Sequence, residues 1–225
     1  LGLIDLSLTV AYESKVNYDD IFSQVRVWDT LIANHLMQKN ICVPPREEHS
    51  KETKYEGAYV KEPQLGQHKW IVSFDINSLY PHIIIQYNIS PEKIVGQTSH
   101  GINVNKMIDM KVPLNYLKTE GACVTPNGAK FKNDAQGFLP EMMEKMYNDR
   151  VVYKKRMLKA KQQYERTKAP ELVKEIARCH NIQWARKIAL NSAYGAVGNQ
   201  YFRYYDVRQA SGITTAGQFI IRFIE

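Results

Sequence analysis

The sequence has few cysteines and no long apolar run, and both absences narrow the classes of protein it fits. Its three cysteines are far apart and form no CxxC or Cys/His pattern, which excludes a disulfide framework and predicts reduced thiols: Cys42, Cys123 and Cys179. The longest apolar runs, such as residues 83–85, are far too short to cross a bilayer. The first residues lack the pattern of a secretion signal. We therefore expect a cytoplasmic protein without a membrane partner.

Basic residues outnumber acidic ones, and the excess is confined to one segment. The chain has 30 Lys and Arg against 23 Asp and Glu, a net charge of +7 and a pI near 9.2. Residues 141–190 alone hold 13 Lys and Arg against 6 Asp and Glu, so the rest of the chain is neutral. Such a distribution favours one localised anion site over a generally basic surface. For any single cation, however, a solvated charged face remains the simpler explanation.

Hydrophobic spacing gives a coarse division of the chain into helical and extended stretches. Residues 3–38 have helical spacing, and residues 96–136 alternate weakly, as strands and loops do. Two long helices are predicted at about 140–167 and 170–197, with Lys168 and Ala169 at the tip between them. The last residues have the spacing of an apolar helix interrupted within its pattern. Together with the missing initial Met, this suggests a piece of a longer protein.

Residues 69–76 alternate between two faces and predict a half-buried strand that ends at Asp75. A turn follows, and Pro81 suits the first position of a short helix over residues 82–87. An acid at a strand end can hold a divalent cation, and the amides of Ser78, Leu79 and Tyr80 can hold phosphate. By itself this arrangement is weak support, because such an Asp is more often a turn former or a helix cap.

The two predicted long helices carry cations at matching heights. Arg150 and Lys154 are four residues apart on one helix, and Lys187, Asn191 and Tyr194 share one face of the other. Residues equally far from the tip of an antiparallel hairpin lie level with one another. The three cations can therefore face each other, and their repulsion favours a bound anion such as a triphosphate.

Four motifs in this order resemble those of family B DNA polymerases. Residues 75–81 (DINSLYP) resemble the palm motif D-x-x-S-L-Y-P, and residues 187–195 (KIALNSAYG) resemble the fingers motif K-x-x-x-N-S-x-Y-G. Residues 150–154 (RVVYK) match the Arg and Lys of the first fingers helix, and residues 55–58 (YEGA) resemble the Tyr-x-Gly-Gly/Ala element. Residues 87–92 and 202–206 are most similar to replicative polymerases of T-even-like phages.

The resemblance implies an α+β fold, with a palm of antiparallel sheet and helices and a fingers domain of two antiparallel helices. Residues 1–46 would then be a helical connector from the exonuclease or N-terminal region. Residues 47–135 would form the first part of the palm, residues 136–199 the fingers, and residues 200–225 a second, truncated part of the palm. A phage-encoded enzyme of this kind would act in the host cytoplasm.

The resemblance also implies template-directed addition of deoxynucleotides to a primer 3′ end, with two Mg²⁺ ions and primer–template DNA. Asp75 and Lys187 would be the catalytic residues. The implied metal ligands are Asp75 and the Ile76 carbonyl; the implied nucleotide ligands are Ser78, Leu79, Tyr80, Arg150, Lys154, Lys187, Asn191 and Tyr194; and the implied DNA contacts are Tyr55, Gly57 and Gly195. Within the nucleotide set, Tyr80 would lie under the sugar and exclude a 2′-hydroxyl group.

The sequence departs from the family pattern in several places. The second metal-binding motif, Asp-Thr-Asp, is absent, as are the exonuclease acids and the thumb, so we expect this chain alone to be inactive. Position 82 is His where the motif usually has Ser; we expect a packing role for it, because Mg²⁺ prefers oxygen ligands. Contacts with a sliding clamp and other replication proteins, through regions outside this chain, are left open.

Two other interpretations remain. A catalytically dead homologue would only bind primer–template or nucleotide. Two acids in an Asp-x-Asp turn in downstream sequence would favour the enzyme, and their loss would favour the binder. A palm-type RNA polymerase or reverse transcriptase is disfavoured by Leu79-Tyr80 and by the paired helices.

Overall fold

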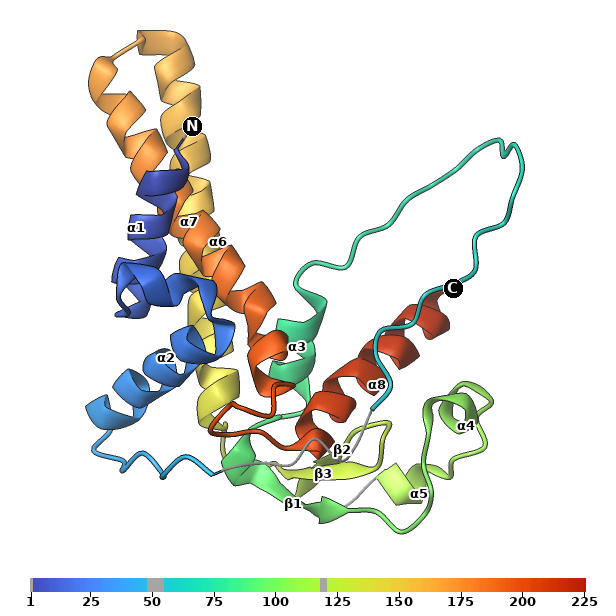
Figure 1. Cartoon of the computed structure of the whole chain (residues 1–225). Helices are drawn as coiled ribbons and strands as arrows, with labels where there is room; N and C mark the ends of the chain where they lie inside the picture. The colour runs from blue at the N-terminus through green and yellow to red at the C-terminus, as the bar shows by residue number, and fades with distance from the viewer. Residues whose placement is uncertain (1, 48–54, 118–120) are drawn as a thin grey trace.

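Helices dominate the chain, with one small antiparallel sheet (Figure 1). The computed structural model describes residues 2–47, 55–117 and 121–225. In chain order the elements are α1 (Leu3–Ser14), the 3-10 helix η1 (Tyr18–Phe22), α2 (Gln24–Gln38), α3 (Leu79–Gln86), the 3-10 helix η2 (Pro91–Lys93), β1 (Ile94–Gln97), α4 (Val104–Ile108), α5 (Leu114–Leu117), β2 (Ala122–Val124), β3 (Ala129–Lys132), α6 (Phe138–Thr167), α7 (Pro170–Val197) and α8 (Val207–Ile224). The mixture of helices and an antiparallel sheet agrees with the expected α+β class. Among the helices described, none combines the length and apolar composition that a bilayer crossing requires.

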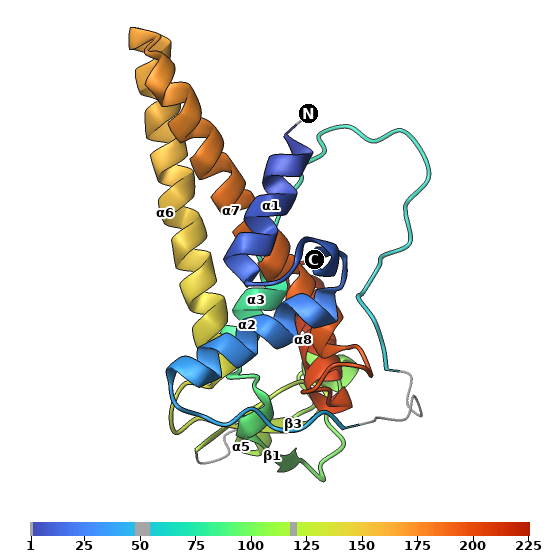
Figure 2. The same ribbon diagram turned by 60° about the vertical axis from the view of Figure 1, so that its left-hand side comes forward.

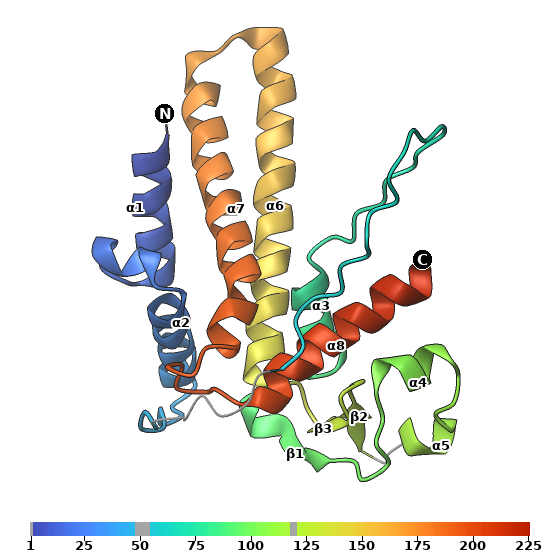
Figure 3. The ribbon, with the colours of Figure 1, turned by 45° about the vertical axis from the view of Figure 1, so that its right-hand side comes forward.

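Helices α6 and α7 form the predicted antiparallel hairpin, which rises well beyond the rest of the chain (Figures 1 and 3). The turn uses two residues. Lys168 has a left-handed backbone with φ 53°, which ends α6, and Ala169 is extended. Pro170 then opens α7, where its fixed φ suits a first helical position and its missing N–H costs nothing. The predicted tip is thus confirmed, and α6 starts two residues before the predicted Pro140.

The N-terminal helices lie against one side of the hairpin (Figure 2). The predicted helical stretch 3–38 is divided into α1, η1 and α2, because Lys15 turns left-handed with φ 58° and ends α1. Ser23 begins α2 by accepting a hydrogen bond from the Arg26 amide at 3.3 Å, a side-chain cap of the usual kind. Both helices contact α7, so this region supports the hairpin near its base.

The small sheet has the strand order β1-β3-β2, with both pairs antiparallel. Its central strand carries the fully buried residues Ala129 and Phe131. Gly96, with φ 145°, lies where the register between β1 and β3 shifts. The prediction of strands and loops for residues 96–136 is correct for β2 and β3, but it missed the helices α4 and α5. Asn103 caps α4 by accepting from the Lys106 amide at 2.9 Å.

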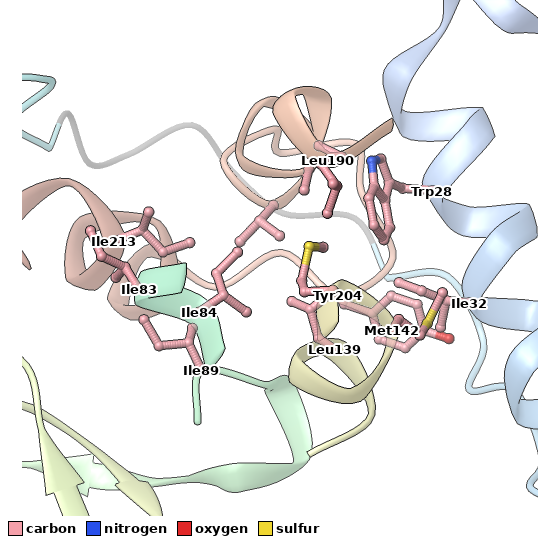
Figure 4. Close-up of a cluster of buried hydrophobic side chains, with 14 of the residues drawn as sticks. Trp28, Ile32, Ile83, Ile84, Ile89, Leu139, Met142, Leu190, Tyr204 and Ile213 are labelled. Carbon is pink, nitrogen blue, oxygen red and sulfur yellow. The ribbon is translucent and has the colours of Figure 1, made fainter. Parts of the chain in front are cut away.

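The core lies where the base of the hairpin meets α2, α3 and α8 (Figure 4). Helix α2 contributes Trp28 and α3 contributes Ile84, both at most 1% exposed. The Trp28 indole also donates a hydrogen bond to the Ala189 carbonyl of α7 at 3.2 Å. Leu190 from α7 and Ile213 from α8 complete this contact. The packing holds the first turn of α3 beside both long helices, which is the arrangement on which the candidate site depends.

The predicted strand over residues 69–76 is wrong. These residues belong to a long extended segment that arches away from the helices and the sheet (Figures 1 and 3), and they form no β-strand. Trp70 and Phe74 are 97% and 85% exposed. An alternating pattern becomes a strand only where a neighbouring strand takes its backbone hydrogen bonds. In the described part of the chain, no strand pairs with this segment.

Candidate active site

The first turn of α3 presents backbone groups at the end of the extended segment. Ser78 precedes the helix in a left-handed conformation with φ 51°. Pro81 carries no N–H, so the free donors of this turn are the amides of Leu79 and Tyr80. His82 faces elsewhere: its Nδ1 lies 2.9 Å from the Ser78 carbonyl and its ring packs edge-on to Tyr147. These contacts agree with the packing role expected for His82.

A cavity of about 1110 Å³ lies where residues 75–81 meet α6, α7 and α8. It is open to solvent and brings together residues that are far apart in the chain. The residues predicted from sequence that line it are Asp75, Ile76, Ser78, Leu79, Tyr80, Arg150, Lys187 and Asn191. Outside residues 74–81, the lining residues that were not predicted from the sequence are Tyr59, Lys61, Ile221, Ile224 and Glu225. No local motif marks these five, because they reach the cavity through contacts between distant segments.

Two cations that line the cavity have no neutralising partner among the described residues. No carboxylate in the described part of the chain forms an ion pair with Arg150 or Lys187, and the buried Nε of Arg150 makes no hydrogen bond there. Within the described ranges, Arg150 donates one long hydrogen bond, 3.4 Å, to the Ser78 hydroxyl. Next to Lys187, by contrast, Arg186 lies 2.6 Å from Glu13. A buried or half-buried cation without a counter-ion is a group that an anionic ligand can satisfy.

Lys154 does not join this pair. It is exposed on α6, one turn beyond Arg150, and it does not line the cavity. The prediction that three cations share one level therefore holds in this structure only for Arg150 and Lys187. The reason is geometric, because a residue four positions further along α6 lies about 6 Å further from the base of the hairpin.

Three tyrosines contact one another at the cavity: Tyr80 lines it, and Tyr194 and Tyr55 lie behind Tyr80. The rings of Tyr80 and Tyr194 are 4.9 Å apart, and the Tyr194 hydroxyl donates to the Tyr55 hydroxyl at 3.4 Å. Tyr80 also lies over Gly217 of α8, where a β-carbon would come within 2.9 Å of the ring. Burial raises the pKa of Tyr80 and of Tyr194 above the usual value, and Tyr55 adds to both shifts. Tyr80 therefore lines the cavity as a neutral ring with a fixed support.

The segment that includes Tyr55 and Gly57 is attached to α8. Thr214 donates to the Glu56 carbonyl at 2.8 Å, and Gln218 donates to the Gly57 carbonyl at 2.7 Å. Space beside Gly57 is open, whereas the side chain of Gln24 occupies the space over the exposed Gly195. Neither glycine lines the cavity, and neither does Tyr55 or Tyr194.

The acids of the cavity differ in their surroundings. Asp75 is exposed and lines the cavity, whereas Glu225 forms an ion pair with Lys61 and accepts a hydrogen bond from Tyr59 at 3.3 Å. The described residues contain no cluster of three His, Cys, Asp or Glu side chains that could enclose a metal. Asp75 and the Ile76 carbonyl are oxygen donors of the kind Mg²⁺ prefers, and Mg²⁺ commonly takes its remaining ligands from water and substrate phosphates.

Comparisons with known proteins agree with the family resemblance of the motifs. The family model for DNA polymerase family B matches residues 20–225. The chain is 32% identical to the DNA-directed DNA polymerases of Escherichia phage RB69 and Enterobacteria phage T4, in each case over 99% of this chain and 29% of the relative. It therefore spans less than a third of these relatives. The family B DNA polymerase of Pyrobaculum calidifontis has a similar fold, with a TM-score of 0.69 at 24% identity over 98% of this chain and 26% of that one. The chain belongs to DNA polymerase family B.

Proposed function

We propose that this chain provides part of the nucleotide site of a template-directed DNA polymerase that adds deoxynucleotides to a primer 3′ end. The proposal rests on one observation. Arg150 and Lys187, which have no ion-pair partner among the described residues, line the same cavity as the exposed carboxylate of Asp75. A volume of about 1110 Å³ is ample for a nucleoside triphosphate. The membership of the chain in a DNA polymerase family supports the same substrate class.

In this proposal residues 47–135 and 200–225 belong to the palm, and the α6–α7 hairpin is the fingers. Arg150 would bind two phosphate oxygens through its planar guanidinium, and Lys187 would supply a point charge to the reacting phosphate. The amides of Leu79 and Tyr80, and that of Ser78, would hold the triphosphate tail at the positive end of α3. Lys154 would reach this tail only if the hairpin tilts toward the palm, as fingers that close over a substrate do.

Asp75 and the Ile76 carbonyl would hold a divalent cation, for which we propose Mg²⁺, together with the phosphates. When bound, such an ion activates the attacking 3′ oxygen and offsets charge on the phosphates. Among the described residues that line the cavity, Asp75 is the one acid without an ion pair, so the isolated chain is expected to bind nucleotide without incorporating it. Asn191 and Tyr194 would border the new base pair, and Tyr55, Gly57 and Gly195 would contact template DNA, in a reaction that takes place in the cytoplasm.

The test is primer extension by the complete polymerase that carries this chain. Lys187→Ala is expected to slow incorporation about a hundredfold or more, because a positioned donor to transition-state charge is lost. Lys155→Ala is the matched control, since it removes a positive charge from α6 without touching the cavity. An incorporation rate for Lys187→Ala equal to that of the control would refute the proposed role. Nucleotide binding with no incorporation by the unmodified polymerase would favour a protein that only binds its ligand.

A further inference from the structure

A line of residues on α7 extends the cavity wall toward the tip of the hairpin. His180, Trp184, Lys187 and Asn191 follow one another at helical spacing and so share one side of the helix. Lys187 and Asn191 line the cavity, whereas His180 and Trp184 lie beyond its edge. Neither aromatic residue belongs to the motifs that identified the family. Their place next to Lys187 nevertheless connects them with the nucleotide site proposed above.

The Lys187 ammonium rests on the indole ring of Trp184. Its Nζ lies 4.5 Å from the ring centroid, within the range of a cation–π contact with the aromatic side chain that binds cations best. The His180 ring stacks on the same indole, with centroids 5.8 Å apart and an angle of 15° between the planes. Trp184 is still 38% exposed, so these contacts do not make it a core residue. The Trp184 indole therefore has the His180 ring stacked on it and the Lys187 ammonium over it.

The contact compensates for a partner that Lys187 lacks. In the described ranges no carboxylate forms an ion pair with this lysine, although Arg186 beside it is paired with Glu13. A free lysine side chain has four flexible bonds and would sample many positions in solvent. A ring face restricts the ammonium to one region, here the cavity edge, without neutralising its charge. The ammonium has three N–H donors and the ring occupies one side of it, so the remaining donors stay available for phosphate.

We propose that Trp184 is a positioning residue that holds the Lys187 ammonium at the wall of the nucleotide cavity before the triphosphate binds. The inference rests on the proposed role of Lys187, and it explains why the lysine ammonium is already in place when the triphosphate binds. Trp184 makes no contact with the nucleotide in this arrangement and acts only through the lysine. Its loss therefore weakens nucleotide binding, because the lysine must then be ordered at the moment of binding.

The experiment measures single-nucleotide incorporation by the complete polymerase with Trp184→Ala, Trp184→Phe, Lys187→Ala and the double variant Trp184→Ala/Lys187→Ala. Trp184→Ala is expected to raise KM for the deoxynucleotide about two- to fivefold, the range of an exposed cation–π contact, with kcat unchanged. Trp184→Phe retains a ring face and is expected to restore most of the binding. The double variant is expected to match Lys187→Ala, because Trp184 has nothing to position once the lysine is gone.

Tyr164→Ala is the matched control. The Lys168 ammonium lies 5.3 Å from the Tyr164 ring at the tip of the same hairpin, far along the chain from the cavity residues. This variant removes an aromatic ring under a lysine and is expected to leave KM and kcat unchanged. An unchanged KM in Trp184→Ala would overturn the inference, as would an equal loss with and without Lys187. If Lys187→Ala itself has no effect, the proposed function of Lys187 fails first, and that result is distinct from the other two.

Discussion

At the scale of single residues, the candidate site depends on which charges are already satisfied. Adjacent positions on α7 show the contrast: Arg186 contacts Glu13 and Asp149, whereas Lys187 has an aromatic ring and open solvent around it. Across the cavity, Arg150 has a buried Nε with no hydrogen-bond partner in the described ranges. A cation that is already paired gains little from a ligand, and one that is partly desolvated and unpaired gains more. This contrast is the reason that we propose Arg150 and Lys187, and not Arg186, as the residues that bind an anion.

Tyr80 offers a residue-scale prediction about the sugar. Its ring lies in the cavity wall, fixed between Tyr194 and Gly217. Tyr80→Ala is expected to lower the preference for deoxynucleotides over ribonucleotides about tenfold or more, because the bulk that would meet a 2′-hydroxyl is lost. Tyr80→Phe is the control and is expected to keep the preference, since the ring remains. The measurement is the ratio of incorporation efficiencies for the two nucleotides in the complete polymerase.

A second substitution tests the same idea without changing Tyr80. Gly217→Ala would place a β-carbon 2.9 Å from the Tyr80 ring, a distance that forces the ring to move. The preference for deoxynucleotides is expected to fall in the same direction as in Tyr80→Ala, by a smaller factor. A preference that stays at the unmodified value in both Tyr80→Ala and Gly217→Ala would rule out a steric role for this ring.

At the scale of elements, the guanidinium of Arg203 links the base of the hairpin to α2. Arg203, in the turn after α7, donates two hydrogen bonds to Asp29 at 2.7 and 3.1 Å and one to the Pro44 carbonyl at 2.6 Å. Both side chains of the pair are at most 20% exposed. A planar fork of this kind cannot be reproduced by lysine. The orientation of α7, and with it the place of Lys187, therefore depends partly on Arg203.

Arg203→Lys is expected to lower the free energy of unfolding by about 1–2 kcal/mol, the scale of charge-assisted hydrogen bonds lost at a partly buried site. Arg208→Lys is the matched control. Arg208 also forks onto an aspartate, Asp206, but the two are only two residues apart and connect no separate elements. Denaturant unfolding of the chain measures both variants. Equal losses in the two would show that the fork contributes locally rather than between elements.

The elements that the sequence predicts well are those determined by local rules. The α6–α7 hairpin was predictable because helical spacing runs through each helix and Pro170 marks the start of the second. Helix α4 was not, since five residues are too few to show a period. The strand at 69–76 failed because strand formation requires a pairing partner that local spacing does not reveal. In the site, Asp75, Arg150 and Lys187 came from motifs, whereas Lys61 reaches Glu225 across 164 positions and no motif encodes that contact.

At the scale of the whole molecule, both net charge and buried apolar side chains are distributed unevenly along the chain. The net charge of +7 belongs to residues 141–190, which include most of the hairpin, while the remainder is neutral. Apolar residues are also unevenly covered: α2, α3 and the base of α7 share one core, whereas residues 70–74 expose three large apolar side chains and a tryptophan. The helices that share the core, and the α6–α7 hairpin, are therefore expected to be far more resistant to local unfolding than the extended segment that includes residues 70–74.

Limited digestion with chymotrypsin tests that expectation. The enzyme cleaves after large apolar side chains in backbone that can adopt an extended form, and Trp70 and Phe74 meet both conditions. The first cuts in the chain are expected after one of these two residues, well before any cut within α6 or α7. Replacing both by Ser is expected to slow the first cleavage markedly, because the remaining aromatic residues are mostly buried or helical. If residues 69–76 resist cleavage while the helices are cut, these residues form the paired strand that their alternation predicts, and the segment is not extended and exposed.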